Sequence, residues 1–281
     1  MMKYRTDRKI GIMGIVNLTD NSYFAESRVL SPDGTPDMDR TLGRIGKMIE
    51  EGADIIDIGA CSTRPGSEPV GKEKEWKRLE PVLKAINSAF PNISISIDTY
   101  WAEVVSKTFD LIGPFIVNDI SAGEDDEPML KTVGERELTY IAMHKRGNPK
   151  TMQTLTDYAD VTEDVCGYFR DFALKAERNG IGNWILDPGF GFAKTIGQNY
   201  QMLGNLSRFK DFGRPLLVGM SRKSMIFKLF GITPEDSLPA TQVLHYKALC
   251  EGADILRVHD VAEAARTVEL YRKLEKTDNE S

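Results

Sequence analysis

The chain has 281 residues, of which 41% are hydrophobic, and it carries a formal net charge of -6. This length fits one large α/β domain as well as two smaller ones, but no Pro- or Ser-rich linker divides the sequence. The acidic balance argues against nucleic-acid and anionic-membrane partners, because both kinds of interaction depend on basic patches. We therefore expect any cluster of cations to be local and pocket-sized.

The cysteines and the N-terminal residues indicate the compartment. Cys61, Cys166 and Cys250 are too few and too scattered for a disulfide framework or a zinc site. Residues 1–9 are charged and have no apolar core, and no later apolar run approaches the length of a membrane span. We expect a soluble protein of the reduced cytoplasm without a cleaved signal.

Short aliphatic runs alternate with helical patterns along the whole chain. We expect strands at residues 9–17, 55–58, 93–97, 115–120, 138–143, 184–186 and 215–219, and a last strand that leads into residues 257–260. We expect a helix from Met38 onward and further helices at residues 73–89, 101–107, 158–179, 199–209, 239–250 and 261–276. About eight strand-helix units in this order predict an α/β fold, a TIM (β/α)8 barrel. One domain would then span residues 1–281, with its core at about 9–276.

An internal echo supports repeated units. Glu51-Gly-Ala-Asp-Ile-Ile-Asp-Ile-Gly59 returns two hundred residues later as Glu251-Gly-Ala-Asp-Ile-Leu-Arg-Val-His-Asp260. In both places a glycine ends a helix, and a buried strand then leads into polar residues. A barrel of repeated strand-helix units predicts an echo of this kind.

Polar residues fall just past the predicted strands. They are Asn17, Thr63, Arg64, Asp98, Asn118, Asp187, Lys223, Arg257 and His259. TIM-barrel enzymes carry their chemistry on the loops at the C-terminal ends of the strands. The sequence therefore predicts that these side chains converge on one mouth of the barrel.

The set divides into two kinds of chemistry. Arg64, Arg257 and His259, together with the hydroxyls of Ser62 and Thr63, are suited to an anion with several oxygens, such as pyrophosphate.

The second group consists of Asp98, Asn118, Asp187 and Lys223. Its acceptors, amide and ammonium group are suited to reading the edge of a planar heterocycle. Either Asp98 or Asp187 could also stabilise a developing cation.

Each of these residues could also have a purely structural role. Asp187-Pro-Gly could be a plain turn, and the glycines at 189 and 191 could only ease it. Further structural roles would be a solvated surface pair at Arg222 and Lys223, an ion pair between Arg257 and Asp260, and a core histidine at His259. Joint placement at strand ends argues against these roles.

The ordered motifs resemble those of the dihydropteroate synthase family of pterin-binding proteins over nearly the whole chain. They are Met13-Gly-Ile-Val-Asn, Ser62-Thr-Arg-Pro-Gly, Ile97-Asp-Thr, Asn118-Asp-Ile-Ser, Asp187-Pro-Gly-Phe-Gly-Phe, Gly219-Met-Ser-Arg-Lys-Ser and Arg257-Val-His-Asp. The resemblance implies a transferase of folate biosynthesis that joins 4-aminobenzoate to 6-hydroxymethyl-7,8-dihydropterin pyrophosphate. It further implies Mg2+, a TIM barrel and a homodimer, and in this family sulfonamides compete with aminobenzoate.

The resemblance also implies roles for individual residues. The implied catalytic residues are Asp98, Asp187 and Lys223. The implied pterin-binding residues are Asp98, Asn118, Met143, Asp187 and Lys223. The implied pyrophosphate ligands are Thr63, Arg64, Arg257, His259 and Asn17, which also stands at the Mg2+ site. The implied aminobenzoate pocket consists of Thr63, Pro65, Phe192, Lys223 and Ser224. The implied mechanism is dissociative: pyrophosphate leaves, a pterin methyl cation forms, and the aniline nitrogen attacks it.

The first loop departs from the family pattern. The usual Thr-Pro-Asp-Ser-Phe is here Thr19-Asp-Asn-Ser-Tyr23, and the family acid a few residues on is replaced by Ala25, with Glu26 beside it. Ala193 also replaces the usual glycine before Lys194. We hypothesise that Glu26 supplies the missing carboxylate. Two rival functions are a pterin-dependent methyltransferase, although the chain carries no cobalamin module, and a non-catalytic pterin-binding protein.

Overall fold

The computed structural model describes residues 10–19, 35–61, 70–148 and 150–278. Its strands are β1 (Gly11–Asn17), β2 (Ile55–Gly59), β3 (Ser94–Asp98), β4 (Ile116–Asp119), β5 (Thr139–Met143), β6 (Trp184–Asp187), β7 (Leu217–Val218) and β8 (Ile255–Val258). All are parallel and form one sheet in the order β6-β5-β4-β3-β2-β1-β8-β7. A bridge between Leu186 and Leu216 joins the two edges of the sheet. The predicted TIM barrel is therefore confirmed.

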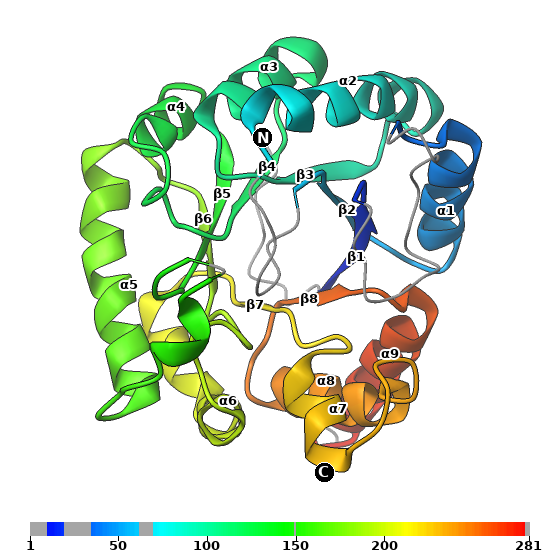
Figure 1. Cartoon of the computed structure of the whole chain (residues 1–281). Helices are drawn as coiled ribbons and strands as arrows, with labels where there is room; N and C mark the ends of the chain where they lie inside the picture. The colour runs from blue at the N-terminus through cyan, green and yellow to red at the C-terminus, as the bar shows by residue number, and fades with distance from the viewer. Residues whose placement is uncertain (1–9, 20–34, 62–69, 149, 279–281) are drawn as a thin grey trace.

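Helices surround the strands as an outer ring (Figure 1). They are α1 (Met38–Glu50), α2 (Lys72–Ala89), α3 (Ala102–Ile112), α4 (Met129–Glu135), α5 (Val161–Arg178), α6 (Ile196–Gly204), α7 (Ser224–Phe230), α8 (Leu238–Cys250) and α9 (Val261–Asp278). Two 3-10 helices, η2 (Met152–Thr154) and η3 (Leu206–Phe212), complete the described elements. The sequence did not predict α4 or α7, which are only seven residues long.

Three predicted helices are wrong at their ends. The helix expected at 101–107 continues to Ile112 and ends at Gly113, which has a positive φ of 76°. The helix expected at 158–179 begins only at Val161, because the Asp160 carboxylate accepts hydrogen bonds from the backbone N–H groups of the first turn and so caps the helix there. The single helix expected at 199–209 is divided, since α6 ends at Gly204 and η3 follows. Thr195 and Gln198 form a capping box that starts α6 earlier than expected.

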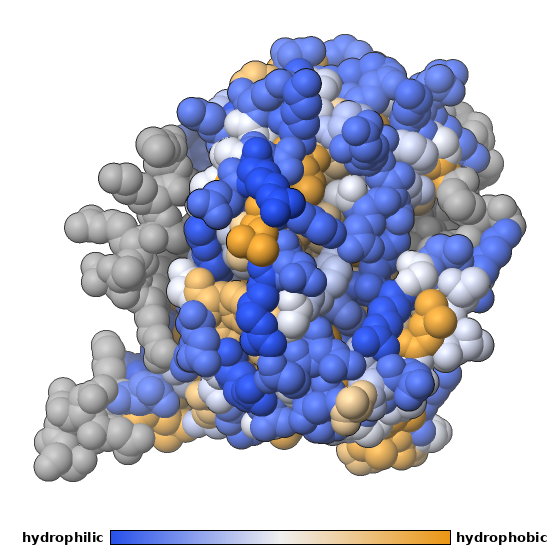
Figure 2. Space-filling model, turned by 90° about the vertical axis from the view of Figure 1, so that its left-hand side faces the viewer, coloured by the Kyte–Doolittle hydropathy of each residue, from blue (hydrophilic) through white to orange (hydrophobic). Residues whose placement is uncertain are grey.

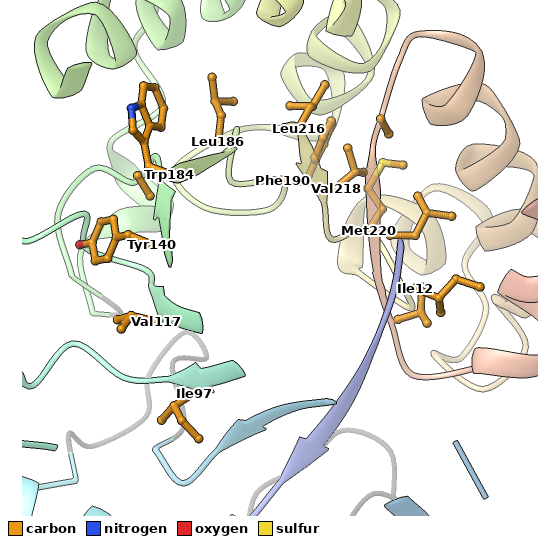
Figure 3. Close-up of a cluster of buried hydrophobic side chains, with 14 of the residues drawn as sticks. Ile12, Ile97, Val117, Tyr140, Trp184, Leu186, Phe190, Leu216, Val218 and Met220 are labelled. Atoms are coloured by element: carbon orange, nitrogen blue, oxygen red, sulfur yellow. The ribbon is translucent and has the colours of Figure 1, made fainter. Parts of the chain in front are cut away.

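The barrel strands separate two apolar regions. Inside the barrel is a plug of buried side chains, one from each strand except β3: Met13, Ile55, Ile116, Ile141, Ile185, Leu217 and Ile255. The alternate residues of the same strands belong to the larger core between strands and helices. Figure 3 shows Tyr140, Trp184 and Leu216 of this outer core pointing away from the barrel interior. The plug closes the barrel, so polar chemistry is confined to its ends.

The described helices do not include one with both the length and the apolarity that crossing a bilayer requires. The face that carries α5 is largely hydrophilic, with apolar residues in small separate groups (Figure 2).

The internal echo of the sequence has a structural counterpart. The Asp54 carboxylate accepts a hydrogen bond from the Ile12 backbone N–H at 3.0 Å. Two hundred residues later, the Asp254 carboxylate accepts the N–H of Leu216 at 2.9 Å. The backbone N–H of each aspartate donates back to the carbonyl of the same partner residue. Each aspartate thus fixes the register at the start of a strand.

We expect Asp54→Ala and Asp254→Ala each to lower the free energy of unfolding by about 1.5 kcal/mol. This is near the low end for hydrogen bonds to charged groups, because both side chains are partly exposed. Urea denaturation measures the loss. Glu50→Ala, at an exposed acid near the end of α1, is the control and should change stability by less than about 0.5 kcal/mol. If the two aspartate variants are as stable as this control, the aspartates do not fix the strand register.

Candidate active site

A polar layer lies directly above the apolar plug. Strand side chains alternate with a period of two, so the residue two positions beyond each plug residue faces the same interior. For five of the plug residues that position holds Asp57, Asn118, Met143, Asp187 and Arg257. Four of these were predicted site residues, and the structure brings them together at the C-terminal ends of the strands.

Asp57 is the centre of this layer. Its side chain is completely buried and accepts hydrogen bonds from three different strands. The donors are the Ser96 hydroxyl at 2.7 Å, the Asn118 amide nitrogen at 3.1 Å and Arg257 Nε at 2.7 Å. The Asn118 amide is therefore held with its oxygen turned away from Asp57.

Arg257 bridges two carboxylates. Its Nη2 lies 2.5 Å from Asp57 Oδ2 and 2.7 Å from Asp98 Oδ2. Burial raises the pKa of Asp98, the Arg257 guanidinium opposes this rise, and the Asp57 carboxylate adds to it. For Arg257 burial lowers the pKa, but the attraction of Asp57 and Asp98 outweighs burial and raises it. The guanidinium thus stays charged, and the two carboxylates share its charge.

Asp187 and Lys223 form a second pair of opposite charges. The Asp187 carboxylate accepts the Gly189 N–H at 2.8 Å, and Lys223 Nζ donates to the Phe190 carbonyl at 2.5 Å. Burial raises the pKa of Asp187, and the Lys223 ammonium is the main opposing influence. Burial lowers the pKa of Lys223 to about 8, against the attraction of Asp187. Lys223 Nζ also lies 4.8 Å from the centroid of the Phe192 ring.

The loop after β6 is held by a lysine that sequence reasoning did not assign to the site. Lys194 is buried and donates at 3.0 Å to His144 Nδ1 and to the carbonyls of Gly189 and Phe192. Burial lowers its pKa to about 7. Gly189 has φ +71° and would place a Cβ 2.0 Å from the His144 carbonyl, so only glycine fits there. These contacts fix the position of Phe192.

The turns after β7 and β8 are joined. Ser221 Oγ accepts the His259 N–H at 3.2 Å and lies 3.1 Å from His259 Nδ1. The Arg222 guanidinium donates to both oxygens of Asp260, at 2.8 and 2.7 Å. The alternative of an ion pair between Arg257 and Asp260 is therefore wrong, because each of these residues has a different partner. A solvated Arg222–Lys223 surface pair is also wrong, since the Arg222 side chain is only 8% exposed.

The remaining predicted residues fall into two groups. Asn17 is half-buried at the end of β1, Met143 is buried at the end of β5, and Ser224 is the first residue of α7. The other group lies outside the described residues: Thr63, Arg64 and Pro65, with Ser62, Ala25 and Glu26.

Asp57 is the principal residue that the sequence reasoning missed, because it stands inside a strand and not after one. The sequence did contain a signal. The internal echo places Asp57 and Arg257 at equivalent positions of their units, 200 residues apart, so opposite charges occupy the same inward site on β2 and β8.

We expect Asp57→Ala to lower the free energy of unfolding by about 3 to 5 kcal/mol, because it removes a fully buried partner from the Arg257 guanidinium, whose side chain is only 20% exposed. Ser96→Ala removes one neutral donor to the same carboxylate, so it should cost only about 1 kcal/mol. Thermal and urea unfolding measure both. Equal losses in the two variants would show that Asp57 is an ordinary hydrogen-bond acceptor.

The chain is similar to known proteins over most of its length. Residues 13–259 match the profile of the family described as pterin binding enzyme. The chain is 40% identical over 269 residues to dihydropteroate synthase of Escherichia coli (strain K12), covering 95% of this chain and 91% of that one.

Two solved structures show the same fold. Yersinia pestis dihydropteroate synthase in complex with a sulfonamide drug has a TM-score of 0.87 and 33% identity, over 95% of this chain and 94% of that one. Xanthomonas albilineans dihydropteroate synthase with 4-aminobenzoic acid has a TM-score of 0.85 and 32% identity, over 95% of this chain and 94% of that one. The chain described here therefore belongs to the dihydropteroate synthase family of pterin-binding enzymes.

Proposed function

We propose that this protein is a transferase that condenses 6-hydroxymethyl-7,8-dihydropterin pyrophosphate with 4-aminobenzoate, giving 7,8-dihydropteroate and pyrophosphate in folate biosynthesis. The observation that carries the proposal is the polar layer, in which carboxylates, an amide and a guanidinium stand together above an apolar plug, with the Lys223 ammonium near Asp187. The family membership supports the same reaction. We further propose that one pterin-binding barrel domain spans residues 1–281.

Three side chains of the layer are suited to the pterin ring. The Asn118 oxygen accepts a ring N–H, because the amide nitrogen is already given to Asp57. The Asp187 carboxylate accepts from the amino-pyrimidine edge, and the Lys223 ammonium donates to ring acceptors. Met143 supplies an apolar wall at the end of β5. All four residues stand at strand ends or in the turn after a strand, so the ring site is preorganised.

The pyrophosphate group would lie at the same mouth. Arg257 donates hydrogen bonds to carboxylates from Nε and Nη2, so its remaining N–H groups can donate to a phosphate oxygen. Burial lowers the pKa of His259 to about 3, so it acts as a neutral donor and not as a cation. Thr63 and Arg64 complete this proposed site.

Residues beside the pterin site would hold aminobenzoate. The Phe192 ring offers an apolar face to the benzene ring, and it lies next to the Lys223 ammonium. Ser224, at the start of α7, offers a hydroxyl to the substrate carboxylate. Thr63 and Pro65 are the other proposed members of this pocket, and sulfonamides would compete for it.

The proposed chemistry is dissociative. The bond between the pterin methylene carbon and oxygen breaks, and pyrophosphate leaves with the electron pair. The ionised carboxylates of Asp98 and Asp187 stabilise the resulting pterin methyl cation electrostatically. The lone pair of the aniline nitrogen then forms the C–N bond, and the nitrogen releases a proton. Lys223 keeps the ring oriented throughout.

The residues present fit a Mg2+ ion that is held mainly by the substrate. No group of three or more His, Cys, Asp or Glu within the described ranges could hold a metal. Mg2+ usually takes one or two protein ligands and completes its shell with phosphate oxygens and water. The Asn17 amide oxygen, at the end of β1, is the proposed protein ligand. When bound, the ion would neutralise charge on the leaving pyrophosphate.

Product formation tests the proposal directly. Purified protein, Mg2+, the pterin pyrophosphate and 4-aminobenzoate should yield dihydropteroate, and Asp187→Asn should weaken pterin binding. Tight pterin binding without product would favour a non-catalytic binding protein. Methyl transfer from a methylated tetrahydropterin to free cobalamin, without C–N bond formation, would favour a methyltransferase.

The pH dependence of kcat/KM should be bell-shaped. Above a pKa of about 8, Lys223 loses its proton and with it a donor to the ring. The raised pKa of Asp98 means that this carboxylate becomes protonated, and loses its charge, at a higher pH than the usual value of about 4. Lys223→Arg should move the basic limb upward, whereas the exposed Lys228→Arg should leave it in place. If the basic limb stays at the same pH in Lys223→Arg, the titrating group is not Lys223.

We also propose a homodimer, formed through the outer surface of α8 and α9. Val243, Leu270 and Leu274 are large apolar side chains that are more than half exposed on these helices. The two helices are tied together by the Thr267 hydroxyl, which donates to Gln242 Oε1 at 2.8 Å, and they lie side by side in Figure 1. Burying such side chains favours association.

Sedimentation velocity tests the proposed dimer surface. The double variant Val243→Glu/Leu270→Glu should be monomeric, because each new charge would have to be desolvated in the interface. Leu174→Glu changes an exposed leucine of α5 and serves as the matched control. A dimer that persists in the double variant would place the interface elsewhere.

A further inference from the structure

One buried arginine outside the polar layer reaches the mouth of the barrel from the helix ring. Arg78 lies on α2 and is only 5% exposed. Its Nη1 donates to the backbone carbonyl of Leu18 at 3.3 Å and to that of Ala60 at 3.2 Å. A single guanidinium nitrogen therefore holds two segments that are 42 residues apart in the sequence.

These two carbonyls mark the points where the chain leaves the sheet. Leu18 follows the last residue of β1, and Ala60 follows the last residue of β2. The bond from the Leu18 N–H to the Gly59 carbonyl, at 2.7 Å, continues the ladder between these strands past the end of β1. Leu18 and Ala60 are both completely buried. Arg78 thus fixes the starting points of the loops that follow β1 and β2.

Arg78 is not explained by an ion pair with the acid nearest to it along α2. Glu75 is three residues earlier, so it lies on the same face of the helix. It is completely buried, and the side-chain group that interacts with its carboxyl is the Thr99 hydroxyl and not the Arg78 guanidinium. Burial raises the pKa of Glu75 to about 8, which keeps it mostly neutral at pH 7. The guanidinium is therefore directed toward the two backbone carbonyls and not toward this acid.

We propose that Arg78 is a positioning residue for aminobenzoate binding: it sets the exit geometry of the loops after β1 and β2 without contacting substrate. The inference rests on the proposed function, which assigns Thr63 and Pro65 of the second loop to aminobenzoate. The ring-reading residues Asn118 and Asp187 stand on other strands, so pterin binding should not depend on Arg78. A purely structural role would instead affect both substrates alike.

Arg78→Met removes the donors and keeps much of the volume, whereas Arg78→Lys keeps the charge but loses the planar fork. We expect Arg78→Met to raise KM for aminobenzoate by about tenfold or more. The KM of Arg78→Lys should lie between those of wild type and Arg78→Met. The Kd of 6-hydroxymethyl-7,8-dihydropterin, measured by calorimetry, should change by less than about twofold in both. Lys77→Met removes a charge from the same helix at a position outside the buried face and is the matched control.

Hydrogen exchange provides a readout that is independent of activity. In Arg78→Met, exchange of the Leu18 and Ala60 amides should become faster, while that of β4 and β5 stays unchanged. If wild type and Lys77→Met form no dihydropteroate, the proposed function fails, and exchange still decides whether Arg78 fixes the loop starts. Unchanged exchange at these amides overturns the inference. An equal loss of affinity for both substrates in Arg78→Lys would also overturn the inference. Arg78→Lys is the variant to use if Arg78→Met does not fold.

Discussion

The ion pair between Asp57 and Arg257 is the interaction on which the rest of the site depends. It links β2 to β8 across the intervening β1, and Asp57 also holds Asn118 while Arg257 also holds Asp98. Removing charges from water is costly, so a buried pair persists only when further hydrogen bonds satisfy its remaining groups. The polar layer is consequently one connected network, and a change at one member alters the orientation of the others.

The apolar plug explains why this network can be rigid. The side chains beneath it fill the barrel interior, so the polar layer stands on a packed base and does not line a channel. Strands carry Asn118, Met143 and Asp187, which are proposed to bind the pterin ring, whereas loops carry Lys223 and much of the proposed aminobenzoate and pyrophosphate sites. Arg78 binds the chain at the points where β1 and β2 become loops.

Burial and charge act against each other at the titratable groups of the layer. Burial alone would neutralise Asp98, Asp187 and Lys223, and the opposite charges beside them limit that effect on their pKa values. Groups held in this balance lie nearer to neutral pH than ordinary side chains do, a property that acid–base and electrostatic catalysis require.

The sequence by itself determined the architecture and much of the site. Apolar periodicity and glycine stops are local signals, so they predicted the barrel and placed Asp98, Asn118 and Asp187 at strand ends and Lys223 in the turn after a strand. Only the tertiary structure decided which charges meet. Arg257 binds Asp57 and Asp98, and not Asp260, because closure of the barrel brings β8 beside β1 and one strand away from β2. Partners 200 and 159 residues apart are chosen by strand order and register, which no local pattern encodes.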